Sequence, residues 1–559
     1  MKSFRVVNAK FCILKGGKIG LSLSISLVVS SLIFSTTKAN AVDYFTDVQV
    51  STGTATNTTG LYDVTVQTAT NTGTFDLSRL STTYDSVVFK PVSWVSSSYG
   101  TPSFVGNFDS NSDSINDGST YSLNATSSTD KLTLTFNTNA NAGSISKDNT
   151  TVYSAPITTN VDIYANSTYN LTTSTSTAYT ANLIFQGSNN ISGATNIGDG
   201  NIKLNGGVTF GGTVNAGYIS VDTTNTIIFN SNVDLTAGTT DAMNFSVNGK
   251  VLLNEDFTAN ITSSGDNLGT VTIVGNGTGK EQIITGNIGT STSSDIGILY
   301  IGSDTIDSNY SRTVIYGDVY ANSTVLNNNG TTNSSSTLVL ANGSDITSTI
   351  TTADVNMGIL TLLGSSTVTG TVGSTGKLAE VNSGATGSNS TFIGTVNSVN
   401  VTNTGTGTTI FQDDVTATNV NVNSGTSTFQ DNLTATTTTI TTGTGNFNTV
   451  SGTTSLNIAF TGDGVANLNR GLTGNVTTNS AGTGTLNLVG SNNQTVNGNV
   501  GVGNALKDVN SGVNGTTSTF IGTVNSVNVT NTGTGTTIFQ DDVTATNVNV
   551  NSGTSTFQD

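Results

Sequence analysis

Adjacent carboxylates are the first candidates for chemistry in this chain. Asp413 and Asp414 are neighbours, and the same pair returns as Asp541 and Asp542. Two carboxylates can act as general acid and base on a polysaccharide. The related turn at 429–432 keeps only one of the two acids. Because a catalytic pair is not expected in several neighbouring copies, we interpret these acids as solvated turn residues.

The residue types that most catalytic sites need are missing. The chain has no histidine, and its one cysteine is Cys12. The sequence therefore excludes Ser-His-Asp and Cys-His catalysis within this chain, as well as His-ligated zinc. The arginines beyond residue 41 are Arg79, Arg312 and Arg470, far apart in the sequence. We predict that the protein is not an enzyme and has no cofactor.

Two short motifs resemble ligand loops only in part. The segment from Asp109 to Thr120 has calcium-type spacing at its start but lacks the sixth-position glycine and the final acid of that loop. The segment 275–280 ends in Gly279-Lys280, but Glu281 stands where a phosphate-binding loop has Ser or Thr. We predict no metal site and no phosphate site from either motif.

An exact duplication organises the second half of the chain. Residues 390–431 and 518–559 are identical, and the two copies begin 128 positions apart. From the first copy onward a shorter period repeats a phenylalanine, at positions Phe392, Phe411, Phe429 and Phe447 in the printed sequence. Far upstream, Phe210 and Phe229 show a similar spacing, with Val214 and Val233 following in step. Such repetition indicates a solenoid.

Within each unit the apolar residues alternate with polar ones. Val415-Thr416-Ala417 and Val420-Asn421-Val422 have the period of two that a half-buried strand requires. Gly, Asn, Ser and Thr separate these short strands and supply turns. We predict an all-β fold, a right-handed parallel β-helix with coils of about 18–20 residues. The phenylalanines would form an internal aromatic stack, and the offset of 128 would equal seven coils.

We interpret the N-terminus as a secretory signal peptide. Basic residues from Lys2 to Lys18 precede the apolar segment 19–34, and Ala39-Asn40-Ala41 matches a small-residue cleavage site. We predict that Ala39 and Ala41 direct cleavage and that the mature chain begins at Val42. The alternative, a membrane anchor, is disfavoured because the segment is short and rich in serine. Cys12 lies in the signal, so the mature chain has no thiol.

The charge balance limits the partners. The whole chain has 17 basic and 34 acidic residues, a net charge of −17. Nucleic acid and anionic lipid are bound through cationic surfaces. We therefore predict no nucleic-acid partner, and together with the signal this composition favours an exported protein at a bacterial cell surface.

The repeats are similar to those of a known family. The signal, the Thr/Asn/Gly-rich units and segments such as 494–501 followed by 519–524 resemble the passengers of rickettsial surface antigens of the outer-membrane protein A and B type. The resemblance covers roughly residues 180–559 and implies an autotransporter at the cell surface or outer membrane of a Gram-negative bacterium, where it acts as an adhesin or surface coat. It implies two partners, a surface or host-cell receptor and an outer-membrane translocator barrel. No barrel pattern is present in the sequence, so the barrel would be encoded downstream or be missing.

These observations predict three segments: the signal peptide at 1–41, an N-terminal β-rich capping region at 42–180 and the β-solenoid at 181–559. The capping region contains the one tryptophan, Trp94, and all three prolines. The favoured function is an adhesin or surface coat. Two alternatives stay open: a self-assembling surface-layer protein and, less favoured, a polysaccharide hydrolase or lyase.

Overall fold

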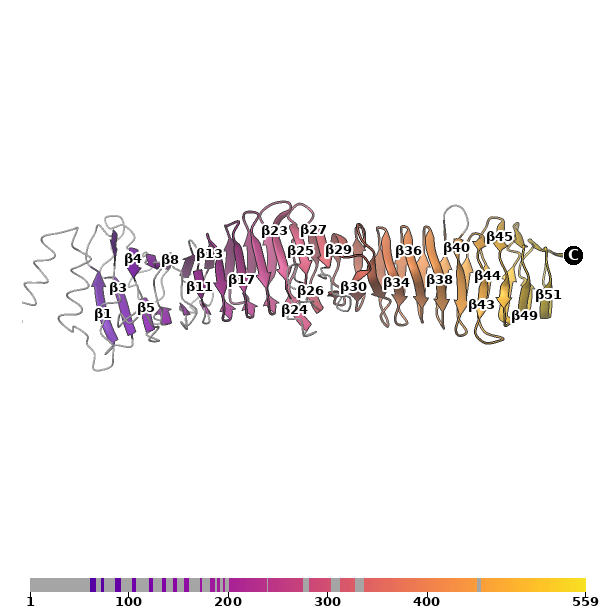
Figure 1. Ribbon diagram of the computed structural model, residues 1–559, viewed down its shortest axis with the longest axis horizontal. Helices are drawn as coiled ribbons and strands as arrows, with labels where there is room; N and C mark the ends of the chain where they lie inside the picture. Colours follow the sequence, from indigo (N-terminus) through magenta and orange to yellow (C-terminus); the bar gives the residue numbers. More distant parts are fainter. Residues whose placement is uncertain are drawn as a thin grey trace, which may run out of the picture. The chain divides into compact units, whose positions relative to one another are not determined.

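The computed structural model describes residues 201–559 apart from 239, 275–280, 303–311, 327–335, 450–453 and 559; before residue 201 it describes short strands between 61 and 196. All regular elements in these residues are β-strands (Figure 1). A search of the same residues finds no helix long and apolar enough to cross a membrane. The chain divides into two compact units, Met1–Ser264 and Gly265–Asp559. We describe each unit by itself.

The first unit is built from stacks of parallel strands in which successive coils pair with one another. One stack contains β8 (Ala155–Thr159), β10 (Ala181–Phe185), β13 (Asn201–Leu204), β16 (Tyr218–Val221), β19 (Ala242–Phe245) and β22 (Asn260–Ser263), and a shorter one β2 (Thr72–Thr74), β4 (Ser103–Gly106) and β6 (Thr133–Phe136). Another contains β11 (Asn189–Ile191), β14 (Val208–Phe210), β17 (Thr226–Phe229) and β20 (Lys250–Leu253). The last contains β1 (Leu61–Val66), β3 (Ser86–Pro91), β5 (Thr120–Leu123), β7 (Ser144–Lys147), β9 (Leu171–Thr172), β12 (Thr195–Asn196), β15 (Val214–Asn215), β18 (Val233–Asp234) and β21 (Phe257–Thr258).

The predicted phenylalanine repeat is confirmed in this unit. Phe210 and Phe229 are paired in register, their rings are stacked with centroids 5.0 Å apart, and both are fully buried. Val214 pairs with Val233 in the next stack. Residues of the same type therefore occupy the same place in successive coils, which is what a solenoid requires.

The second unit has three parallel sheets, which we call A, B and C in the order in which the chain visits them in each coil. Sheet A contains β31 (Thr367–Thr369), β33 (Asn389–Phe392), β35 (Thr408–Phe411), β37 (Thr426–Phe429), β39 (Thr444–Phe447), β41 (Val465–Leu468), β44 (Thr485–Leu488) and β47 (Leu506–Ser511). Sheet B contains β23 (Leu268–Ile273), β25 (Ile296–Ile301), β42 (Leu472–Thr473), β45 (Gln494–Asn497), β48 (Thr517–Phe520), β50 (Thr536–Phe539) and β52 (Thr554–Phe557). Sheet C contains β24 (Glu281–Thr285), β26 (Arg312–Tyr316), β28 (Thr337–Leu340), β30 (Met357–Leu362), β32 (Leu378–Ser383), β43 (Val476–Thr478) and β46 (Val500–Val502).

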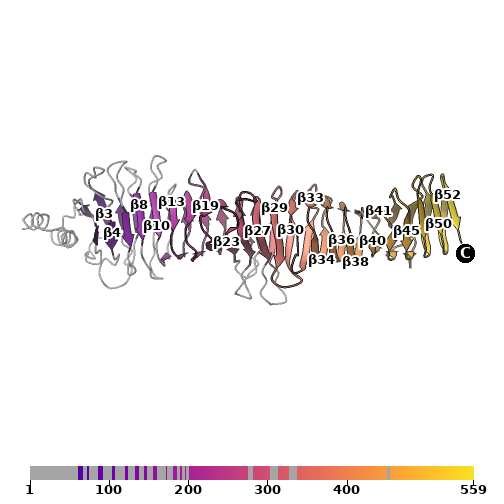
Figure 2. The ribbon, with the colours of Figure 1, turned by 90° about the horizontal axis from the view of Figure 1, so that it is seen from above.

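Longer strands turn a corner and belong to two sheets. β27 (Val319–Leu326) and β29 (Ile346–Thr352) join A to B; β34 (Val396–Asn403), β36 (Val415–Val422), β38 (Leu433–Ile440) and β40 (Thr454–Phe460) join B to C; β49 (Val524–Asn531) and β51 (Val543–Val550) join C to A. In Figure 2, β33 and β41 of sheet A lie along the side opposite to β34, β36, β38 and β40. The prediction of a parallel β-solenoid is confirmed.

The core of the second unit is built from the alternation that the sequence shows. In β37, Ser427 and Phe429 are buried, while Thr426 and Thr428 face outward. Phe392, Phe411, Phe429 and Phe447 stack in sheet A with ring centroids 5.0 to 5.7 Å apart. The predicted internal aromatic stack is therefore confirmed, and it forms because parallel pairing places the same residue of each coil at the same depth.

Coil length varies along the second unit. Phe392, Phe411, Phe429 and Phe447 are register partners in successive coils, so the short interval between them is the length of one coil, as predicted for the repeated block. Elsewhere coils are longer, since Phe447 pairs with Leu468 and Ile288 pairs with Val319. In these two coils the additional residues lie in the segments between strands, from β39 to β40 and from β25 to β26.

Some corners require glycine. Gly425 has a φ of +68°, and a Cβ built on it would lie 2.2 Å from the Gly407 carbonyl oxygen of the preceding coil. Gly553, its counterpart in the second copy, has a φ of +74° and the same close approach to Gly535. At both corners the coils stack closely because glycine has no side chain.

The two identical blocks lie on different sheets. Phe392 is in sheet A, whereas its counterpart Phe520 pairs with Val496 in sheet B. Val396, which follows Phe392 in the chain, lies on sheet B. Six coil-to-coil steps along sheet B lead from Val396 to Phe520. These steps pass through Val415, Leu433, Thr454, Leu472 and Val496.

The second copy is therefore displaced by six coils and one third, not by the seven whole coils expected from the sequence. The expectation was wrong because several coils between the copies are longer than the coils of the repeated block. The local structure is nevertheless kept: the side chain of Asn419 donates to Asn400 at 3.0 Å, and that of Asn547 donates to Asn528 at 2.8 Å. The repeat specifies the geometry of a coil without specifying the sheet on which each strand lies.

Candidate functional site

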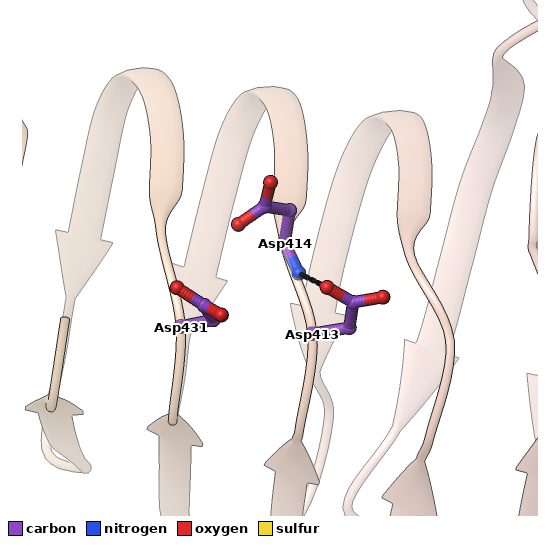
Figure 3. A group of neighbouring side chains, drawn as sticks. All are labelled: Asp413, Asp414 and Asp431. Carbon is purple, nitrogen blue, oxygen red and sulfur yellow. Dashed lines mark hydrogen bonds between the residues drawn. The ribbon is translucent and has the colours of Figure 1, made fainter. Parts of the chain in front are cut away.

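The acids singled out in the sequence meet at one corner of the second unit. Asp413 and Asp414 follow β35, and Asp431 follows β37 in the next coil (Figure 3). One carboxylate oxygen from each lies within 4.8 Å of the others. Such oxygens suit Ca²⁺, but that ion takes about 6–8 oxygen ligands. Three carboxylates at a partly exposed corner supply only part of such a set.

Hydrogen bonds give two of these acids a structural role. The backbone N–H of Asp414 donates to Asp413 Oδ1 at 2.8 Å. Asp414 Oδ1 in turn accepts from the backbone N–H of Asn432 at 3.2 Å and from its Nδ2 at 3.0 Å. The carboxylate of one coil thus satisfies the backbone of the next at a corner where the strand ladder is interrupted.

The same device recurs at other corners. Asp318 accepts from the backbone N–H of Asp345 at 3.0 Å, and Asp345 accepts from that of Thr367 at 2.6 Å. Asn475 accepts in the same way from Asn499 at 2.9 Å. These corner acids and amides hold successive coils together, which supports the interpretation of Asp413 and Asp414 as turn residues.

Only some of the other residues singled out in the sequence lie in the described part of the chain. Ala39, Ala41 and Val42, the calcium-like segment from Asp109 and the glycine segment 275–280 all lie outside the described residues, so these stay predictions. Arg312 forms an ion pair with Glu281 at 3.5 Å. Arg470 donates through Nε to the Thr449 carbonyl at 3.4 Å. The acidic corner has no ion pair with a cation among the ion pairs of the described residues.

A second candidate surface is the outer side of sheet A from β33 to β44, which we call the Thr/Asn face. Each of its six strands points two side chains outward, and ten of these twelve residues are Thr or Asn. None of the twelve is charged. Strand register arranges them in two rows, the first formed by Asn389, Thr408, Thr426, Thr444, Val465 and Thr485, the second by Thr391, Ile410, Thr428, Asn446, Asn467 and Asn487.

Side-chain hydrogen bonds run along the second row. Asn446 Nδ2 donates to Thr428 Oγ1 at 3.0 Å, Asn467 Nδ2 to Asn446 Oδ1 at 2.8 Å, and Asn487 Nδ2 to Asn467 Oδ1 at 2.8 Å. The ladder continues into β47, where Asn510 Nδ2 donates to Asn487 Oδ1 at 2.8 Å. This series fixes the orientation of each amide in the row.

None of the sequence-based predictions concerned this face. The signal that predicts it is present: Thr408, Thr426 and Thr444 recur at equal intervals and alternate with buried residues. Beyond Thr444 the coils lengthen, and the continuation to Asn467 and Asn487 follows only from strand pairing.

The chain was compared with protein-family models, with curated proteins and with solved structures, and no match was found. Any functional assignment therefore depends on the residues and on the geometry described above.

Proposed function

We propose that this chain is an exported cell-surface protein of the autotransporter passenger type, which acts as an adhesin or surface coat through the sides of its solenoid. The observation that supports this most is the coil-by-coil repetition of outward side chains on the Thr/Asn face, because repetition produces an extended surface of one chemistry. The resemblance to rickettsial passenger repeats supports the same function.

Export is the first element of the proposal. Cleavage after Ala41 would leave 11 basic and 34 acidic residues, since six of the 17 basic residues precede the cleavage site. Expression with the native N-terminus and intact-mass measurement of the secreted chain tests this. We expect a chain that begins at Val42, and Ala39→Arg should block cleavage whereas Ala39→Ser should permit it.

The autotransporter route includes a partner, an outer-membrane translocator barrel. Sequencing of the DNA beyond the codon for Asp559 tests this element. A downstream segment of alternating strands with aromatic girdles supports it.

Adhesion is the element that concerns the solenoid itself. Beads coated with the mature chain should bind host cells or a bacterial surface, and binding should decrease as coils are removed. Unchanged binding by a chain without residues 181–559 contradicts the adhesin role. An ordered lattice in electron micrographs of the purified chain favours the surface-layer alternative instead.

The proposal also holds that the chain works by binding and not by turnover. The corner acids Asp413 and Asp414 hydrogen-bond to each other and to the next coil, as structural residues do. Incubation of the mature chain with acidic and neutral polysaccharides, followed by reducing-end analysis, tests this. Cleavage that disappears in Asp413→Asn contradicts the proposal.

A further inference from the structure

The Thr/Asn face combines three properties that bear on what it binds. It is uncharged in a chain of net charge −17. Parallel pairing fixes its spacing, about 4.8 Å between coils and about 7 Å between the two rows. The amide ladder from Thr428 to Asn487 holds the last four residues of the second row in one conformation. A partner that binds the face therefore contacts regularly spaced side chains, four of which are already held in place.

The ladder leaves hydrogen-bonding capacity unused. An asparagine amide has two N–H donors and two acceptor lone pairs. Within the ladder, Asn467 gives one N–H to Asn446 and accepts one from Asn487. The second N–H and the second lone pair of Asn467 belong to an outward-facing, half-buried side chain. Each such amide can thus donate to and accept from one partner that carries hydroxyl groups.

We propose that the Thr/Asn face binds an extended, uncharged polysaccharide chain. Sugar hydroxyls both donate and accept, which matches amides and threonine hydroxyls arranged in rows. Because the amides are held by their neighbours, binding orders few additional side chains. This inference rests on the proposed function, in which the solenoid acts through its sides, and it specifies the ligand class for one side.

Two other classes of partner fit the face less well. Nucleic acid and anionic lipid require cationic side chains, and the face has none. The Thr/Asn face is a uniform polar strip roughly 25 Å long. A second copy of the chain that bound to it would bury an area on the order of 300–400 Å². Stable interfaces bury about 800 Å² on each partner. The strip is therefore too small for a stable dimer but long enough for several sugar rings.

Charge placed on the face tests the proposal. The variant T426E/T444E adds two carboxylates to the first row, where both threonines point outward. The matched control T416E/T434E adds the same charges to neighbouring coils on sheet B, again at outward positions. Circular dichroism and thermal unfolding should show that both variants remain folded.

The probes are dextran, mannan and hydroxyethyl cellulose, used in affinity electrophoresis with the mature chain. We expect at least one of these polysaccharides to retard the wild-type chain and the control. For T426E/T444E the dissociation constant should rise by about tenfold or more, because the new carboxylates must be desolvated. Retardation of the wild-type chain by none of the three overturns the proposal, as does equal weakening in both variants.

Two parallel measurements separate this inference from the proposed function. Size-exclusion chromatography with light scattering shows whether T426E/T444E changes the oligomeric state; such a change assigns the face to self-association and overturns the polysaccharide proposal. Cell adhesion is measured with the same three proteins. Adhesion by the wild-type chain without polysaccharide binding overturns the inference and leaves the proposed function standing.

Discussion

At the scale of single residues, the carboxylates of Asp414 and Asp222 accept hydrogen bonds that link neighbouring coils. Asp414 accepts two hydrogen bonds from Asn432 of the next coil. Asp222 in the first unit accepts from Lys203, Ser220 and Ser246. In both places the carboxylate accepts hydrogen bonds from groups in a neighbouring coil, and Asp222 also accepts one from Ser220 of its own coil. These contacts carry predictions for hydrogen exchange and for pH dependence.

The first prediction concerns Asp414. Asp414→Ala removes the acceptor for the Asn432 backbone N–H, and it should lower the hydrogen-exchange protection of that amide by about fivefold. Asp414→Asn keeps an acceptor oxygen at the same place and should change the protection little. Exchange measured by mass spectrometry on peptides covering 429–433 distinguishes the two variants. Equal protection in wild type and Asp414→Ala would show that the hydrogen bond does not form in solution.

The second prediction concerns pH. Burial alone would raise the pKa of Asp222, but hydrogen bonds from Lys203, Ser220 and Ser246 outweigh it and hold the pKa below the ordinary 3.8. The folded pKa is thus depressed, so this group contributes stability above pH 3.8 that is lost as the pH falls through the folded value. Protection of the segment around β13 and β16 should decrease on acidification through this window.

Asp295 should behave in the opposite way. Burial raises the pKa of this carboxyl, and the charge of Asp266 adds to the effect. A raised folded pKa gives stability that is fully present below pH 3.8 and is lost as the pH rises through the folded value. Protection factors, corrected for intrinsic exchange rates, should therefore increase near Asp295 and decrease near Asp222 on acidification. A change of the same sign at both places contradicts these assignments.

At the scale of elements, short strands of period two form the structure because each buries one narrow face. The phenylalanine column of sheet A shows this best: Phe429 is 1% exposed and its ring stacks between those of Phe411 and Phe447. Stacked aromatic rings add to the burial of apolar surface. The strand sequence thus determines which side chains point inward, and the coil-to-coil pairing determines what they touch.

The element-scale prediction compares a buried and an exposed position. Phe429→Ala should cost about 3–5 kcal/mol of unfolding free energy, because it leaves a cavity between two rings. Ile393→Ala, at a corner residue that is 42% exposed, should cost less than about 1 kcal/mol. Urea unfolding followed by far-ultraviolet circular dichroism measures both. Similar losses at the two positions would mean that the aromatic column is not packed as described.

At the scale of the second unit, the position of a repeat is decided by the summed length of its coils. The corner-turning strands join A to B in β27 and β29, B to C from β34 to β40, and C to A in β49 and β51. The second copy of the repeated block consequently presents its outward residues from other sheets than the first. Two identical surfaces of this kind cannot be covered by a single flat partner at once.

Cysteine pairs test this arrangement, since the chain has no cysteine beyond Cys12. Thr495 and Thr519 are register partners on sheet B. T495C/T519C should form a disulfide under mild oxidation, because the neighbouring Cα atoms are within the range that a disulfide spans. N510C/T519C, with one cysteine on sheet A and the other on sheet B, is the control and should stay reduced. The opposite result would place β48 on a different sheet.

The sequence alone predicts much of this fold. The parallel solenoid, the inward phenylalanines, the short coil of the repeated block and the turn role of Asp413 and Asp414 all follow from local patterns. These patterns are reliable because side-chain alternation and turn preference are set within a few residues. The sequence predicts only part of the Thr/Asn face, because the spacing of its residues is regular up to Asn446 and irregular beyond it.

Only the tertiary structure decides where each strand lies around the solenoid. Residues 390–431 and 518–559 are identical, yet Phe392 stacks in sheet A and Phe520 in sheet B. The physical reason is that the sheet occupied by a strand depends on the number of residues in every preceding corner, and one longer corner shifts all later strands. The sequence determined what a coil is made of, and the accumulated pairing from coil to coil decided which face each residue presents.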